Sequence, residues 1–145
     1  MKDFTSRLLL ILSVAAAQVS FMACLSKSFV ERDDAILFDD IVTNQNDEQA
    51  DEPAYNPTTG RFIAPANGTY RVENSGPLFV HLMRNEDIVA SGTNHDDKFE
   101  TTSCNAVLIL KKGEIIWVRL KHGIVFGGSP SHYSAFSGFM LAPTS

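Results

Sequence analysis

The chain has 145 residues, of which 44% are hydrophobic and 20% charged, a globular composition with room for one ordinary domain. Twelve Lys and Arg against seventeen Asp and Glu give a net charge of −5, which excludes a general nucleic-acid binder because such proteins need clustered basic residues. Two Cys are too few for a disulfide scaffold or a four-cysteine zinc site.

The N-terminal segment has the pattern of a targeting signal. Lys2 and Arg7 form a basic start, and an apolar run follows over residues 8–17 and ends on three alanines. The run is too short to cross a bilayer, which takes about 20 residues, and its small residues suit signal peptidase. We predict a signal peptide over 1–17 and an exported domain over 18–145. The alternative is an uncleaved signal anchor with a longer apolar stretch.

After this segment, short apolar runs alternate with Gly, Pro, Asn and Asp, and none has a helical period. This pattern predicts an all-β sandwich or jelly roll. The predicted strands cover residues 21–25, 35–42, 61–64, 69–72, 78–83, 106–110, 115–120 and 135–141. Lys112-Gly113 lies between two of them and predicts a tight hairpin turn. The run 107–110 is apolar at every position, which predicts a strand covered on both faces, the second cover being another subunit.

Polar clusters give few candidates for chemistry. Residues 39–60 carry six carboxylates and no Lys or Arg, which predicts a solvated loop or, as the alternative, a calcium-binding loop. His95-Asp96-Asp97 is the one tight cluster of ligand-type side chains, and we expect a solvated loop there rather than a metal site, because adjacent strand residues point to opposite faces. No nucleophile or phosphate-loop motif is present, so we expect no enzymatic activity and no cofactor.

Five motifs occur in the order in which one known family has them. They are Val19-Ser20-Phe21-Met22-Ala23; Ile36-Leu37-Phe38-Asp39 with Asn44; Tyr55, Thr59-Gly60-Arg61-Phe62, Ala64-Pro65 and Gly68-Thr69-Tyr70; Leu110-Lys111-Lys112-Gly113-Glu114 with Trp117-Val118; and Phe136-Ser137-Gly138-Phe139-Met140-Leu141. Over residues 18–145 the chain therefore resembles the C1q domain, the globular head of the first complement component. Glu114 stands where that family usually has Asp.

The resemblance implies a fold and a function. The fold is a jelly-roll sandwich of about ten antiparallel strands, related to tumour necrosis factor, that assembles as a homotrimer. The function is that of a secreted, non-enzymatic recognition module of innate immunity that binds microbial carbohydrate or lipopolysaccharide. The alternative is an extracellular structural protein or a cytokine-like trimeric signal. We expect no membrane span and no nucleic-acid partner. Six aromatic residues are expected in the core: Phe21, Phe38, Phe62, Tyr70, Phe136 and Phe139.

One segment departs from the family pattern. Between Tyr70 and Asn85 the chain is several residues shorter than the family, and Val72 is followed almost at once by Glu73-Asn74-Ser75-Gly76-Pro77. The strand that begins at Thr69 is therefore expected to be truncated. In the family this strand lies in the sheet that faces the trimer interior, so the truncation would weaken the trimer.

The run after residue 114 offers a candidate ligand face. Alternation along a strand places Ile116, Val118 and Leu120 toward the core. The opposite face carries one aromatic ring and two cations, with two more cations just across the turn: Trp117, Arg119, Lys121, Lys111 and Lys112. An aromatic ring stacks on sugar rings, and cations bind phosphate or carboxylate, so this face suits an anionic glycan. The alternative is a packed Trp beside solvated cations.

Two further features concern covalent chemistry. The resemblance implies that the strands carrying Cys24 and Cys104 share a sheet without being neighbours, so we expect two separate buried thiols. An intramolecular or intersubunit disulfide is the alternative. Asn67-Gly68-Thr69 is a turn that leads into a strand, and it is also an acceptor triplet for N-glycosylation.

Overall fold

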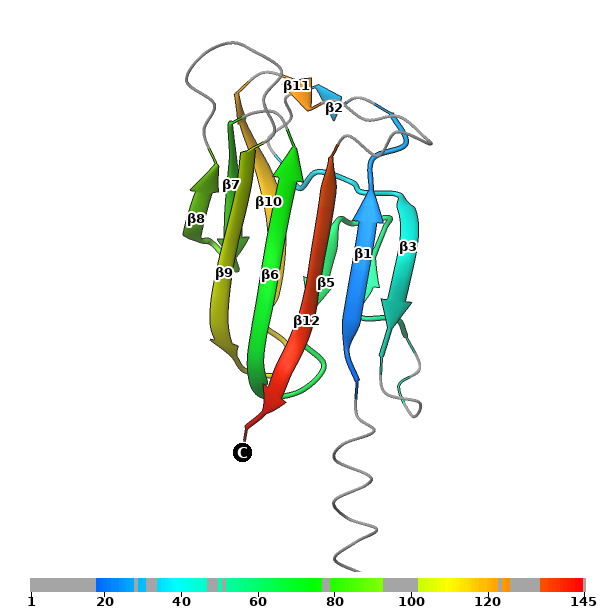
Figure 1. Cartoon of the computed structure of the whole chain (residues 1–145), viewed down its shortest axis with the longest axis vertical. Coiled ribbons are helices and arrows are strands. Elements are labelled where there is room, and N and C mark those ends of the chain that lie inside the picture. The colour runs from blue at the N-terminus through cyan, green and yellow to red at the C-terminus, as the bar shows by residue number, and fades with distance from the viewer. Residues whose placement is uncertain are drawn as a thin grey trace, which may run out of the picture.

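The computed structural model describes residues 18–27, 29–30, 34–46, 50, 52–76, 79–92, 102–122, 124–125 and 134–144, all of which are β-strand, turn or irregular structure without a helix (Figure 1). The predicted signal segment, 1–17, lies outside these ranges. The strands are β1 (Ser20–Cys24), β2 (Phe29–Val30), β3 (Asp40–Gln45), β4 (Tyr55–Asn56), β5 (Arg61–Ile63), β6 (Gly68–Gly76), β7 (Phe79–Arg84), β8 (Asp87–Gly92), β9 (Thr102–Leu110), β10 (Ile115–His122), β11 (Ile124–Val125) and β12 (Ala135–Pro143).

Ten of these strands form two five-stranded sheets, and β2 and β11 form a small separate pair. The first sheet has the order β3-β1-β12-β6-β9, and the second has the order β4-β5-β10-β7-β8 (Figure 1). Neighbouring strands are antiparallel throughout, and strands that are adjacent in a sheet are often distant in sequence, as β12 is from β1 and β6. The predicted sandwich of about ten antiparallel strands is confirmed.

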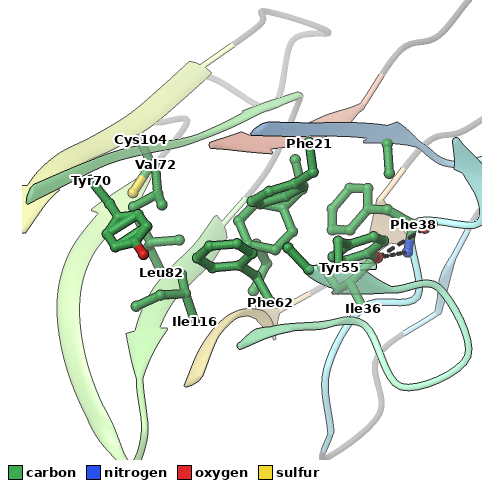
Figure 2. Close-up of a cluster of buried hydrophobic side chains, with 14 of the residues drawn as sticks. Phe21, Ile36, Phe38, Tyr55, Phe62, Tyr70, Val72, Leu82, Cys104 and Ile116 are labelled. Atoms are coloured by element: carbon green, nitrogen blue, oxygen red, sulfur yellow. Dashed lines mark hydrogen bonds between the residues drawn. The ribbon is translucent and has the colours of Figure 1, made fainter. Parts of the chain in front are cut away.

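The core between the sheets is built on aromatic rings (Figure 2). Phe21 of β1 is at its centre, with ring centroids 4.8 Å from Phe62, 4.9 Å from Phe136 and 5.2 Å from Tyr55. The ring of Tyr70 lies 5.7 Å from that of Phe62. Because these rings come from β1, β4, β5, β6 and β12, their mutual packing fixes how the two sheets face each other.

Phe139 is a correction to the expected core. Five of the six aromatic side chains expected there are buried, but Phe139 is 41% exposed on the outer face of the first sheet. It follows Phe136 by three residues, and an odd spacing along a strand reverses the face. The inward position beside it belongs to Gly138, where a Cβ atom would lie 2.8 Å from the Phe21 ring. The ring of Phe21 thus occupies the space that a side chain at position 138 would need.

The described residues of the acidic segment 39–60 include strands as well as loop. The segment contains β3 and β4, and Tyr55 is fully buried. The Tyr55 hydroxyl donates to the Phe38 carbonyl at 2.8 Å and accepts the Phe38 N–H at 3.1 Å (Figure 2). The Asn44 side chain bonds both the N–H and the C=O of Tyr55, at 3.1 and 2.7 Å. These side-chain bonds add to the pairing of β3 with β1 and of β4 with β5, and the polar composition of the segment gave no sign of either strand pair.

The strand after Asn67 is not truncated, so the sequence-based expectation is wrong. β6 runs for nine residues, and every one of them is paired with β9, from Gly68↔Leu110 to Gly76↔Thr102. Its polar second half remains a strand because its inward positions are satisfied by tertiary contacts. Asn74 is buried and donates to the Ala135 carbonyl at 3.0 Å. The shorter connection therefore leaves the centre of the first sheet intact.

The turn at Lys112-Gly113 is tight but is not a hairpin. β9 is the edge of the first sheet, whereas β10 is the middle strand of the second, so the turn carries the chain from one sheet to the other. Gly113 has φ of +94°, a value that favours glycine. The turn is held by Ala64, whose C=O accepts the Gly113 N–H at 2.8 Å and whose N–H donates to the Glu114 carbonyl at 2.9 Å.

Candidate ligand-binding surface

The candidate ligand face lies on the outer side of the second sheet, along β10. Ile116, Val118 and Leu120 are buried in the core, as alternation requires. Trp117 is half-buried and Arg119 is exposed on the opposite side. The backbone of Lys121 belongs to β10, but its side chain lies outside the described part of the structure. The strand therefore presents an aromatic ring and a guanidinium group two residues apart on one surface.

Trp117 is fixed by two contacts. Its indole N–H donates to the Asn85 carbonyl at 2.8 Å, at the turn between β7 and β8, where Asn85 has φ of +51°. The Arg61 guanidinium carbon lies 5.6 Å from the centroid of the indole ring, a cation–π contact. Arg61 in turn forms an ion pair with Asp34 at 3.0 Å. The ring is thus held rigidly at the surface, with one cation already engaged beside it.

A polar row crosses the sheet next to Trp117. Arg119 of β10 is directly opposite His81 of β7, and His81 is opposite Ser91 of β8. Opposed residues in an antiparallel pair share a face and lie within about 5.5 Å of each other. His81 Nδ1 is 2.8 Å from the Ser91 hydroxyl, so this hydrogen bond orients the imidazole. We call Trp117, Arg119, His81 and Ser91 the β10 face.

The structure separates the five predicted ligand residues. Lys111 and Lys112 are exposed at the turn between the sheets, and their backbone N–H groups bond Glu114 Oε1 and Asn67 Oδ1, each at 2.8 Å. Lys112 lines a groove of about 750 Å³ at this end of the sandwich, together with prolines and small side chains. The groove does not include Trp117 or Arg119. The turn lysines and the β10 face are therefore distinct surfaces.

The outer face of the first sheet has a different chemistry. The exposed apolar side chains of β9 and β12 are Ile109 at 71%, Val107 at 61%, Leu141 at 51% and Phe139 at 41%, and β1 and β3 of the same sheet add Met22, Ile41 and Val42. Between β9 and β12, β6 contributes an ion pair of Arg71 with Glu73 at 3.1 Å. An apolar surface of this kind marks an interaction site in soluble proteins. We call these exposed apolar residues of β9 and β12 the apolar face.

Both cysteines are buried and neither forms a disulfide, as the sequence predicts. Cys24 lies on β1 and Cys104 on β9, and β12 and β6 separate those strands in the first sheet. Burial raises the pKa of both thiols, and the charge of Asp40 raises that of Cys24 further. Neither is the exposed, low-pKa thiol that a reactive cysteine requires.

No metal centre is assembled among the residues that the structure describes, which contain no group of three or more His, Cys, Asp or Glu suited to an ion. His95-Asp96-Asp97 and three of the acidic residues of the candidate calcium loop, Asp47, Glu48 and Asp51, lie outside those residues. Calcium binding in that loop therefore stays a prediction. Within the described ranges, no helix has the length and apolar character to cross a bilayer.

Comparison with known proteins identifies the family. The family model of the C1q domain matches residues 20–141. The chain belongs to the C1q domain family. Its similarity to human complement C1q tumor necrosis factor-related protein 3 is 32% identity over 88% of this chain and 52% of that protein. Zebrafish Caprin-2 is 36% identical over 86% of this chain and 14% of its own length.

Solved structures place the fold in the same group. The globular domain of zebrafish complement 1qA superposes with a TM-score of 0.66 at 18% identity, covering 87% of this chain and 99% of that one. The Eiger tumour necrosis factor of S. frugiperda gives 0.57 at 16% identity, covering 89% and 94%. This C1q-domain chain thus has the C1q and tumour-necrosis-factor jelly roll. The chain spans about half or less of the length of the two curated relatives named above. C1q-domain proteins are generally non-enzymatic.

Sequence reasoning found Trp117 and Arg119 but missed their neighbours. Arg61 is 56 positions before the indole that it covers, and no role was assigned to His81 from the sequence. Both positions are set by pairing between strands that are distant in sequence. The alternation of β7 did contain a signal, because His81 and Arg119 are each flanked by apolar residues.

Proposed function

We propose that this protein is a secreted recognition module of innate immunity whose β10 face binds anionic carbohydrate of microbial surfaces, such as lipopolysaccharide. The observation that carries the proposal is the β10 face itself, where a fixed indole ring lies beside a row of polar groups on an otherwise acidic protein. The C1q domain and the signal-like segment 1–17 support a role outside the cell.

The chemistry of the β10 face suits such a ligand. The exposed part of the Trp117 ring offers an apolar surface for the C–H face of a sugar. Arg119 supplies paired N–H donors for a phosphate or carboxylate group, and His81 supplies a further ring nitrogen one strand away. Arg61 is engaged by Asp34, so its main part is to hold the indole ring. Two functions, stacking and anion binding, are therefore divided between neighbouring residues.

Assembly is the second part of the proposal. C1q and tumour-necrosis-factor domains are typically trimeric, and the apolar face offers the surface on which a second copy of this chain packs. Burying exposed Ile, Val, Leu and Phe side chains between copies is favourable by about 25 cal/mol for each Å² of apolar area. In such a homotrimer the β10 face lies on the other sheet and stays accessible in each of the three copies. Three sites in one assembly raise the avidity for a repetitive polysaccharide.

The test is binding of the secreted chain to lipopolysaccharide and to a neutral dextran, with calcium and with a chelator. Arg119→Ala should weaken lipopolysaccharide binding about tenfold, the loss of one charge-assisted hydrogen bond of about 1.5 kcal/mol. Lys111→Ala removes the same charge outside the β10 face and is the matched control, with an expected change under about twofold. His81→Ala should act in the same direction as Arg119→Ala, and Lys121→Ala tests the remaining predicted residue.

Each variant is first checked for unchanged secretion and oligomer mass. Equal effects of Arg119→Ala and Lys111→Ala would show that only overall charge matters and would overturn the β10 face as the site. Wild-type protein that ignores the polysaccharides but binds host cells would replace the proposal with the cytokine-like alternative. Loss of binding on chelation, with the Arg119→Ala effect absent, would move the site to the acidic segment 39–60.

A further inference from the structure

Asn67 joins three segments at one end of the first sheet. It lies directly before β6, and its backbone C=O accepts the Thr144 N–H at 3.0 Å, just beyond the end of β12. Its side-chain Oδ1 accepts the Lys112 N–H at 2.8 Å, in the turn between β9 and β10. The residue thereby fixes the turn and the C-terminal segment relative to the start of β6.

The other side-chain atom of Asn67 faces water. Nδ2 makes no hydrogen bond with any residue in the described ranges, and Asn67 is half-buried. Those ranges contain no buried side-chain nitrogen or oxygen that lacks a hydrogen-bond partner. An unpaired Nδ2 must therefore reach solvent. The carboxamide is oriented by the hydrogen bond to its oxygen, and its nitrogen retains contact with solvent.

This is the arrangement that N-glycosylation leaves undisturbed. Asn67-Gly68-Thr69 is the single Asn-x-Ser/Thr triplet of the chain with an allowed middle residue, because Asn56-Pro57-Thr58 is blocked by its proline. A glycan replaces one hydrogen of Nδ2 and keeps both the amide C=O and the remaining N–H. The hydrogen bond that the Lys112 N–H donates to Asn67 Oδ1 therefore persists in the modified protein.

We propose that Asn67 carries an N-linked glycan, an inference that rests on the proposed secretion. In the transfer, Asn67 Nδ2 bonds to the anomeric carbon of a lipid-linked oligosaccharide diphosphate, the bond from that carbon to the diphosphate oxygen breaks, and Nδ2 loses one proton. The lipid diphosphate is the leaving group, and no oxidant or reductant takes part.

The position of Asn67 keeps the glycan clear of both functional surfaces. Its partners Thr144 and Lys112 lie beyond the ends of strands, so Asn67 is at one end of the sandwich and not on either sheet face. The apolar face and the β10 face are formed from residues within strands. The glycosylated domain can therefore assemble and bind ligand without removal of the sugar.

The experiment uses full-length protein expressed in a eukaryotic secretory host and recovered from the medium. Peptide N-glycosidase should lower the mass of the wild type by one glycan and convert Asn67 to an aspartate that peptide mass spectrometry locates. Thr69→Ala should abolish this mass change, since it destroys the triplet but keeps Asn67 and its hydrogen bonds. Thr69→Ser preserves the triplet and is the matched control, with the mass change retained.

This experiment distinguishes a failure of secretion from a failure of glycosylation. Wild-type protein in the medium without the mass change would overturn the glycan and leave the proposed function standing. Absence of protein from the medium, with unmodified chain inside the cells, would overturn secretion and the glycan together. A mass change that survives in Thr69→Ala would also overturn the assignment. After deglycosylation the oligomer should lose the mass of its glycans and keep the same number of chains.

Discussion

Tyr55→Phe tests whether the hydroxyl of one buried tyrosine holds the acidic segment to the core. The substitution keeps the ring and removes two hydrogen bonds to the backbone of Phe38, at 2.8 and 3.1 Å. Both residues are fully buried, so water does not replace the lost partner. A buried polar group left without a hydrogen bond costs about 1–3 kcal/mol, so two such groups should lower the free energy of unfolding by about 3 kcal/mol.

The matched control is Tyr70→Phe. The Tyr70 hydroxyl makes one hydrogen bond, to the Ala66 carbonyl at 2.7 Å, and Ala66 is partly exposed. Water can take over that bond, so the expected loss is only about 1 kcal/mol. Urea unfolding, followed by the fluorescence of Trp117 as the single tryptophan and at one fixed protein concentration, measures both variants. A loss for Tyr55→Phe no larger than that for Tyr70→Phe would refute the reasoning.

The buried Tyr55 side chain also predicts how the stability of the protein depends on alkaline pH. Burial, aided by the charge of Asp39, raises the pKa of Tyr55 well above its ordinary value, although the Phe38 backbone bond acts against this. In the unfolded chain a tyrosine ionises near pH 10, as an ordinary phenol does, whereas folded Tyr55 keeps its proton. The stability due to this group is therefore present below about pH 10 and is lost as the pH rises further. Tyr55→Phe should lose less stability over that range than the wild type.

The remaining predictions concern assembly, processing and the thiols. Light scattering of the mature protein should give the mass of a trimer. Ile109→Lys puts a charge at the most exposed position of the apolar face and should give monomer with unchanged circular dichroism. A trimeric variant would exclude that face as the interface. The N-terminus of secreted protein should lie at or within two residues of Gln18, and retention of residues 8–17 would favour a membrane anchor. Iodoacetamide should modify Cys24 and Cys104 only after unfolding, since both are buried and their raised pKa disfavours the thiolate; rapid labelling of native protein would contradict their placement.

Local sequence signals predicted most of the sandwich. The strand 115–120 was found with its faces correctly assigned, because its alternating residues are all apolar on the buried side. Gly60 belongs to the matched motif Thr59-Gly60-Arg61-Phe62, and the structure shows why glycine suits this position: φ is +73°, and a Cβ atom there would collide with the Ile36 carbonyl. These features depend on neighbours in sequence or on single residue types, so the amino-acid sequence is enough to predict them.

Two strands were shortened or missed, and each of them depends on a partner that is distant in sequence or on a side-chain bond to one. β6 was predicted to end at Val72 and continues to Gly76, because the Ala135 carbonyl satisfies the buried amide of Asn74. β8, Asp87–Gly92, was not predicted at all, and it exists as the partner of β7. In both cases the information lies in a distant strand rather than in the segment itself, so no local propensity could supply it.

The candidate site divides in the same way. The alternation of β10 predicted that Trp117 and Arg119 share a face, since this needs only one strand. The neighbours of these residues depend on register: His81 is opposite Arg119, and Arg61 lies over the indole ring. The prediction that Lys111 and Lys112 join this face assumed a hairpin, which would have folded β9 back beside β10. The turn instead crosses between sheets and leaves both lysines at the end of the sandwich.

That crossing also places the two proposed functional surfaces on opposite outer faces of one small domain. β9 and β10 are consecutive strands, yet β9 presents Val107 and Ile109 to the outside of the first sheet, and β10 presents Trp117 and Arg119 to the outside of the second. Had they been a hairpin, the apolar and polar residues would have shared one face and competed for it. Because the core separates the two faces, a substitution such as Arg119→Ala leaves the apolar face intact, and Ile109→Lys leaves the β10 face intact. Residues so separated should act independently, so Arg119→Ala should weaken lipopolysaccharide binding per site by the same free energy in the Ile109→Lys background as in the wild type.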